Sequence, residues 1–209
     1  MTAFRLGDIR RGGLLALASA ALFGASTPTA KALTGSTSPF LLAGLLYLGS
    51  GIGLTLWRLV WDRERGPDIR RGELPWLAAA VGAGGVAGPA LLMIGLTGVG
   101  GAAASLLLTL EGVFTALLAW LVFREPFNLR IGLGMAAIVA GGALLALQGG
   151  QGRAEAWGAA AVAAACLAWA VDNNCTSRIS RIDAPTLAAV KGLAAGVVNL
   201  SLGLAVGGT

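Results

Sequence analysis

Ionisable side chains are scarce inside the apolar stretches of this 209-residue chain, so those that occur there are candidates for chemistry. Glu111 is flanked by apolar residues near the middle of one such stretch. If this stretch is a membrane-spanning helix, a carboxylate near its middle costs about 2.5–3.5 kcal/mol to insert into the membrane and should face an interior cavity. Two interpretations stay open: a site for a substrate ammonium or a proton, and a structural carboxylate hydrogen-bonded to a neighbour such as Thr115.

A second polar group closes a later apolar segment. Asp172, Asn173 and Asn174 follow Trp169 by about one helical turn. Acidic and amide groups beside an aromatic ring would suit an amino-acid-like ligand. The alternative interpretation is that the helix leaves the membrane at this point.

Lys191 lies about two turns into the last apolar segment and has three open interpretations. Its long side chain could snorkel to the membrane surface. It could instead act as the counter-ion of Asp172 or Glu111. In the third interpretation it binds a substrate carboxylate.

The same inventory argues against several classes of function. The chain has no histidine, and Cys166 and Cys175 lack the spacing of zinc ligands, so we expect no metal and no cofactor. An intramembrane enzyme would need a Ser–His pair or a second helix-borne Asp to pair with Asp172. The net charge of +5 comes from basic residues between hydrophobic segments, where they set topology instead of binding nucleic acid.

The elements that carry these residues are transmembrane helices. Apolar residues make up 56% of the chain and charged residues 12%. Stretches without charge, such as Ala32–Trp57 and Leu74–Leu110, can cross the roughly 30 Å hydrocarbon layer, and helices satisfy their own backbone there. The sequence predicts an all-α integral membrane protein with about seven helices, at 13–33, 39–60, 75–97, 101–122, 129–147, 157–178 and 185–206.

The basic residues predict the orientation. If the seven helices alternate, almost all arginines fall on the side of the N-terminus. The opposite side receives Arg153 and Lys31. Such asymmetry puts the N-terminus in the cytoplasm of a multi-pass protein of the cell inner (plasma) membrane.

An internal comparison predicts a repeat. Ala21–Ala25 resembles Cys166–Ala170, and Pro39 and Pro185 each open the following helix in a similar context. We therefore expect a five-helix repeat over residues 1–150, followed over 151–209 by the first two helices of a second copy. Because five is odd, that second copy would be inverted.

One segment resembles a known family. The sequence GAAASLLLTLEGVFTALLAW, from Gly101 to Trp120, resembles helix four of the EamA-type drug/metabolite transporters. Phe123–Pro126, the glycine-rich stretch 132–142 and the pattern Leu167–Ala170 continue the resemblance. It implies a ten-helix fold of two inverted repeats that exports or exchanges small metabolites. Against that fold the chain lacks three helices, so its expected partners include either those C-terminal helices or a second copy in a homodimer.

The predicted function is that of a secondary transporter, and not an enzyme. We expect it to export small metabolites or amino-acid-like solutes across the lipid bilayer by alternating access. The alternative is a truncated membrane protein that does not transport and acts only as an assembly partner.

Prolines and glycines complete the prediction. Pro28 and Pro89 interrupt two helices and could serve as hinges or as tolerated bends. The spacings Gly49-x-x-x-Gly53 and Gly84-x-x-x-Gly88 are typical of close helix packing.

Overall fold

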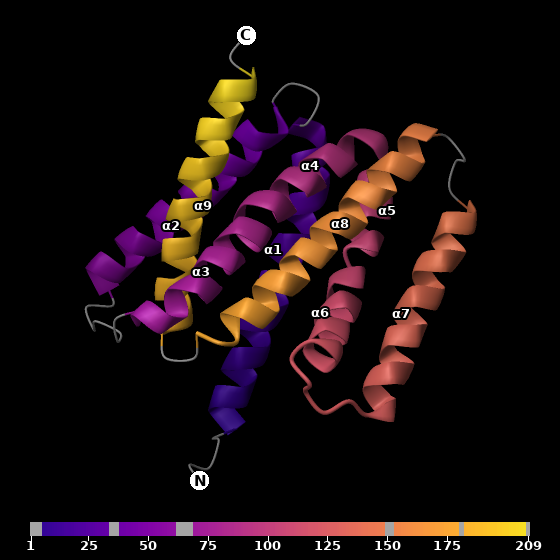
Figure 1. Cartoon of the computed structure of the whole chain (residues 1–209), viewed down its shortest axis with the longest axis horizontal. Coiled ribbons are helices and arrows are strands. Elements are labelled where there is room, and N and C mark those ends of the chain that lie inside the picture. The colour runs from indigo at the N-terminus through magenta and orange to yellow at the C-terminus, as the bar shows by residue number, and fades with distance from the viewer. Residues whose placement is uncertain (1–5, 34–37, 62–68, 149–152, 180–181, 208–209) are drawn as a thin grey trace.

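The computed structural model describes residues 6–33, 38–61, 69–148, 153–179 and 182–207. Over these residues the chain contains no strand. Within the same residues its helical elements form seven successive runs, some made of more than one element, and each run is called a passage (Figure 1). The passages are α1 (Leu6–Leu33), α2 (Pro39–Trp61), the continuous run η1 (Arg71–Glu73), α3 (Leu74–Ala80), η2 (Val81–Ala87) and α4 (Gly88–Gly98), the pair α5 (Gly101–Leu107) and α6 (Leu110–Leu121), and then α7 (Leu129–Gln148), α8 (Arg153–Thr176) and α9 (Ala184–Gly207).

The predicted all-α membrane fold is confirmed. Five of the passages are long and apolar enough to cross a membrane, namely the second, third, fourth, sixth and seventh. Within α7, the shorter stretch Leu129–Ala143 is also apolar. The predicted helix ends agree with the observed ones to within a few residues, except that α1 begins earlier, at Leu6.

The fourth passage differs from its prediction as one unbroken helix over 101–122. It is interrupted between α5 and α6, because the N–H groups of Thr109 and Glu111 bond three residues back, to Leu106 and Leu108. The Thr109 hydroxyl donates to the same Leu106 carbonyl at 2.6 Å. The interruption puts Glu111 in the first turn of α6, where the helix dipole favours a carboxylate.

Helix α8 is the centre of the bundle. It packs against α3, η2 and α4 along one side and against α6 along another (Figure 1). A Cβ atom on Gly158 would lie 2.8 Å from the Gly95 carbonyl oxygen, so α8 and α4 meet backbone to backbone. Small residues allow this approach, and the buried apolar core, which includes Val162 and Leu96, lies beside it.

Helices α2 and α9 form the most extensive helix pair. Gly44 faces Leu200, whereas Gly51, further along α2, faces Leu193, which comes earlier in α9. The two helices are therefore antiparallel. A Cβ atom on Gly44 would lie 2.6 Å from the Leu200 nitrogen, so the glycines set how closely the backbones approach.

The predicted packing role of Gly49 and Gly53 is wrong for the described residues. A Cβ atom on either would meet nothing within 4 Å. The contact glycines of α2 are seven residues apart and lie on another face of the helix. The other motif is confirmed, because Gly84 packs against Asp172 and Gly88 against Trp169.

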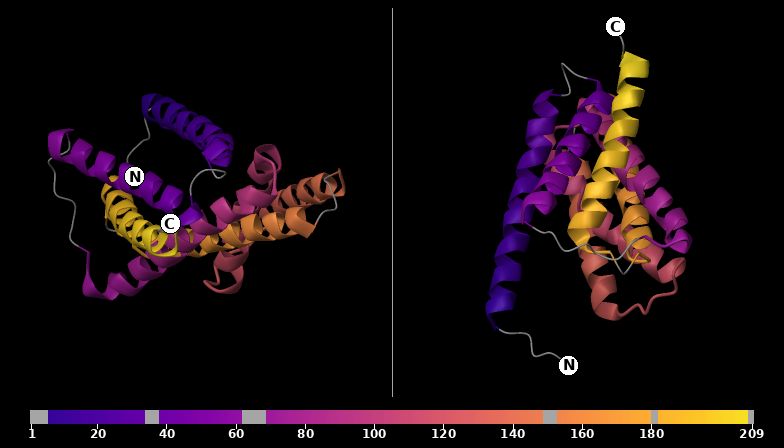
Figure 2. Two further views of the ribbon diagram at one scale, coloured as in Figure 1. Left: turned by 90° about the horizontal axis from the view of Figure 1, so that it is seen from above. Right: turned by 90° about the vertical axis from the view of Figure 1, so that its left-hand side faces the viewer.

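Helix α1 lies at the side of the bundle (Figure 2). It packs on α4 and α5, and the Lys31 ammonium donates to the Leu96 carbonyl. The helix continues through Pro28 to Leu33. The start of α1 and the end of α9 lie at opposite ends of the bundle, as an odd number of passages requires (Figure 1).

Candidate functional site

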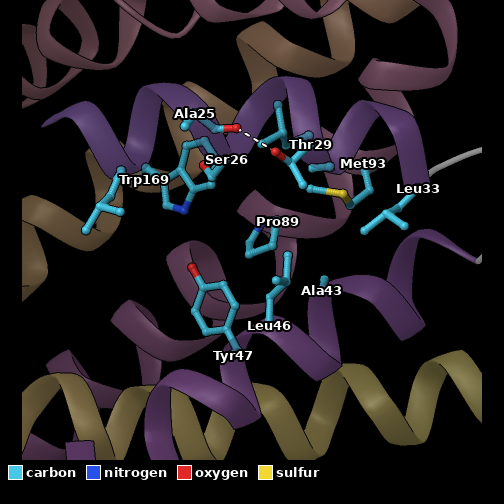
Figure 3. Close-up of a pocket in the computed structure, with 13 residues that line it drawn as sticks. Ala25, Ser26, Thr29, Leu33, Ala43, Leu46, Tyr47, Pro89, Met93 and Trp169 are labelled. Atoms are coloured by element: carbon cyan, nitrogen blue, oxygen red, sulfur yellow. Dashed lines mark hydrogen bonds between the residues drawn. The ribbon is translucent and has the colours of Figure 1, made fainter. Parts of the chain in front are cut away.

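A cavity of about 390 Å³ lies between α1, α2, α4 and α8 (Figure 3). Its walls are mainly alanine, leucine, methionine and Pro89 side chains. Among the described residues, four polar ones also line it: Ser26, Thr29, Tyr47 and Trp169. A mostly apolar wall with a few polar groups is typical of small-molecule sites.

Two of these polar side chains converge on one backbone atom. The Tyr47 hydroxyl donates to the Gly84 carbonyl oxygen at 3.0 Å, and the Trp169 indole N–H donates to the same oxygen at 2.9 Å. Gly84 therefore links α2 and α8 through η2. Glycine is required there by space, since a Cβ atom would lie 2.0 Å from an Asp172 carboxylate oxygen.

The local sequence explains why the Gly84 carbonyl is available. Segment η2 is π-helical, and the Gly88 N–H bonds to Ala83, five residues back. In that register the donor for Gly84 would be the nitrogen of Pro89, which carries no hydrogen. Side chains from neighbouring helices therefore satisfy the carbonyl, as commonly happens beside prolines in membrane helices.

The next carbonyl is satisfied in a similar way. The Gly85 oxygen accepts a hydrogen bond of 2.8 Å from the side-chain amide of Asn199 in α9. Asn199 is fully buried, and among the described residues its amide oxygen has no hydrogen-bond partner. Two successive carbonyls of η2 thus bind side chains from three other helices, and π-helical turns of this kind are frequent at functional sites.

A charged cluster lies on the other side of Gly84. The Lys191 ammonium pairs with an Asp172 carboxylate oxygen, which also accepts a hydrogen bond of 2.8 Å from the Thr176 hydroxyl. Lys191 lies 3.3 Å from that hydroxyl as well. The side chains of Lys191 and Asp172 are 18% and 10% exposed, so the pair is largely removed from solvent.

Glu111 belongs to a separate polar cluster between α6 and α8. The Asn173 amide donates to the Glu111 carboxylate at 2.8 Å and lies 3.3 Å from the Thr115 hydroxyl. Asn174 donates to the Thr115 backbone carbonyl at 3.1 Å. The carboxylate is thus linked to Thr115 through Asn173.

The structure separates residues that the sequence grouped. Trp169 and Pro89 line the cavity, whereas Glu111, Asp172, Asn173 and Lys191 do not. Their proposed contact with substrate stays a prediction. Pro28 lies in α1 against Gly101, with 3.4 Å between the Pro28 Cα atom and the position of a Gly101 Cβ atom.

Sequence reasoning missed Tyr47 and Asn199. Tyr47 is the single tyrosine of the chain and lies within an apolar helix, where a buried hydroxyl needs a partner. Asn199 is an amide inside the last apolar segment and carries the same requirement. Both signals were present, but neither identifies the Gly84 or Gly85 carbonyl as the partner.

Clusters of metal-ligating side chains are absent from the described part of the chain. Within it, no group of three or more Cys, Asp or Glu side chains could hold a metal ion. Cys166 and Cys175 are both buried and unpaired with each other.

The model of the EamA-like transporter family matches residues 10–147, which is more than half of the chain. The chain belongs to the EamA-like transporter family. The matched region runs from α1 nearly to the end of α7 and includes Tyr47, Gly84 and Glu111. No curated protein and no solved structure matches the chain. Together with the apolar helices, membership makes this chain a membrane transporter of the drug/metabolite type, in a family of transporters and not of enzymes.

Proposed function

We propose that this EamA-like chain is a secondary transporter of the inner membrane, which exports small metabolites by alternating access. The observation that carries the proposal is the cavity whose Tyr47 and Trp169 both bond to the Gly84 carbonyl. A solute site at membrane depth beside irregular backbone is a recurring feature of secondary transporters.

Alternating access needs an element with two arrangements. The π-helical turn before Pro89 supports this requirement, because two of its carbonyls, those of Gly84 and Gly85, accept hydrogen bonds from side chains of other helices. Exchange of those side-chain donors would let α2 and α8 move relative to η2. Pro28 in α1 is the second proposed hinge, as predicted from sequence.

Orientation and internal symmetry belong to the same proposal. Four arginines lie near the end of α2, at the start of η1 and just after the ends of α6 and α8: Arg58, Arg71, Arg124 and Arg178. These element ends are at the end of the bundle where α1 starts (Figure 1). This distribution supports a cytoplasmic N-terminus. The antiparallel packing of α2 with α9 supports an inverted second repeat over 151–209.

The proposed partners are a small-molecule substrate, the lipid bilayer, and either a second copy of the chain or further C-terminal helices. An amino-acid-like solute is a second, alternative proposal: it requires the Asp172–Lys191 pair, which lies outside the cavity lining, to open. If that pair opened, its two charges would meet the two charges of such a solute.

Leu45 and Leu46 provide a matched test. They are 53% and 52% exposed, and only Leu46 lines the cavity. Cells that express the wild type, Leu46→Trp or Leu45→Trp are compared by the metabolites in their medium. We expect one or more solutes to accumulate outside cells with the wild type and Leu45→Trp, and not with Leu46→Trp. No solute exported by the wild type, or equal loss with both variants, contradicts the proposal.

A further inference from the structure

We infer that the cavity takes an uncharged, mainly apolar ring compound that carries a hydrogen-bond donor. This inference rests on the proposed transport function and names the class of solute for that site. It follows from the hydrogen-bond donors, the hydrogen-bond acceptors and the charged groups of the cavity walls, which the next three observations describe in turn.

The first observation is that three of the four polar side chains at the cavity already donate their hydrogens within the protein. The indole N–H of Trp169 and the hydroxyl of Tyr47 both point at the Gly84 carbonyl. The Thr29 hydroxyl donates to the Ala25 carbonyl at 2.8 Å (Figure 3). Ser26, the fourth polar residue, also has a partner within the protein. A solute carboxylate would therefore find three of these four side-chain donors engaged and no cation beside them, and burying it without enough partners is costly.

The second observation is that hydroxyl oxygens keep acceptor capacity after they donate. The oxygens of Thr29 and Tyr47 each retain lone pairs when their hydrogens are engaged. The cavity can therefore accept a hydrogen bond from a solute N–H or O–H group. This is the polar contact that its walls favour.

The third observation is that, among the described residues, no ionised side chain lines the cavity to balance a solute charge. Asp172 and Lys191 are paired with each other and lie outside the lining. The Lys31 ammonium, also outside it, donates to a backbone carbonyl of α4. Glu111 accepts a hydrogen bond from Asn173 and also lies outside it. An ammonium would thus lose its hydration with no carboxylate in return.

The size and shape of the walls fit a small ring system. A volume of about 390 Å³ is near the lower end of the range for ligand sites. Pro89 and the ring of Trp169 provide flat apolar surface (Figure 3). Indole, which is planar and uncharged with one N–H donor, represents this class.

The test compares three molecules with the same ring: indole, zwitterionic tryptophan and cationic tryptamine. Radiolabelled forms are equilibrated with the full chain in lipid nanodiscs, and binding to empty nanodiscs is subtracted. We expect saturable binding of indole only. Saturable binding of tryptophan or tryptamine as tight as that of indole, or no saturable indole binding, overturns the inference.

Cavity-filling variants place the binding in the cavity. Leu46→Trp should weaken indole binding by at least about tenfold, whereas Leu45→Trp should leave it unchanged. Ala25→Phe, from the other wall, and its control Ala21→Phe on the same helix repeat the comparison if Leu46→Trp fails to give a monodisperse protein. Indole binding that survives both cavity variants contradicts the inference.

The binding test and the export test fail separately. If the medium of wild-type cells gains a charged metabolite and indole does not bind, the inference is wrong and the transport function stands. If indole binds as expected and no solute is exported, the solute class holds for the cavity and the transport proposal is wrong.

Discussion

Breaking the ion pair between Asp172 and Lys191 should destabilise the bundle, and removing both charges should restore most of the loss. The two side chains are 10% and 18% exposed, and Thr176 supplies the other polar contact to the carboxylate. Lys191→Met leaves the carboxylate without its counter-ion beside Gly84. Loss of one partner of a buried pair costs about 3–5 kcal/mol.

The partial exposure of this pair reduces that cost. With some solvent access to both groups, we expect about 2–3 kcal/mol for Lys191→Met and a similar loss for Asp172→Asn. A change of that size is about 30- to 150-fold in the folding equilibrium constant. The double variant replaces two charges by neutral groups of similar shape, so its loss should be below about 1.5 kcal/mol.

Reversible unfolding of the purified protein in mixed micelles, followed by helical circular dichroism, measures the four stabilities of this cycle. A second cycle on Arg58 and Asp183 is the control, because that pair is 3.9 Å apart and its side chains are 19% and 37% exposed. We expect its coupling to stay below about 1 kcal/mol. Additive losses at Asp172 and Lys191, or equal coupling in both cycles, would refute the reasoning.

Three further predictions use the same unfolding measurement. Gly84→Ala should lower the free energy of unfolding by about 1–3 kcal/mol, because its Cβ atom would overlap the Asp172 carboxylate. Gly82→Ala in the same segment meets nothing within 4 Å and should leave that free energy unchanged. Equal effects of the two substitutions contradict the packing. Tyr47→Phe removes one of two donors to the Gly84 carbonyl and should cost about 0.5–1.5 kcal/mol; no loss would mean that the bond adds nothing. Hydrogen bonds from Thr186 hold the pKa of the Asp183 carboxyl below its ordinary value of 3.8. Its contribution is therefore complete above that value and lost as pH falls through the lower folded pKa, and Asp183→Asn should remove this part of the acid destabilisation; an unchanged pH profile contradicts the assignment.

The sequence predicted the helices well because their signals are local. Charge-free stretches, and prolines such as Pro39 and Pro185, define where a chain can enter and leave a bilayer. The observed ends of α2 and α9 follow these signals. The break before Glu111 was not predicted, because Thr109 is a common residue in membrane helices and its bond to Leu106 depends on local geometry.

The contacts of the candidate site were harder to predict from the sequence than the helices. The pairing of Lys191 with Asp172 was one of several open interpretations, and residue types alone could not choose among them. Gly51 lies on the face of α2 that contacts α9, whereas Gly49 lies on a face without neighbours, and this difference depends on how the two helices pack. The role of Gly84 depends on the π-helical register, in which Pro89 leaves the Gly84 carbonyl without a backbone donor. From the sequence, Pro89 predicted only a hinge or a bend, because the register itself could not be predicted.

Cysteine accessibility at Leu46 tests the central claim, alternating access through this cavity, most directly. A membrane-impermeant maleimide is applied to Leu46→Cys in right-side-out and inside-out vesicles, with Leu45→Cys as control and the wild type, whose described cysteines are buried, as background. The account predicts labelling of Leu46→Cys from both sides and of Leu45→Cys from neither. Labelling of Leu46→Cys from one side only, or from neither, would contradict alternating access through this cavity.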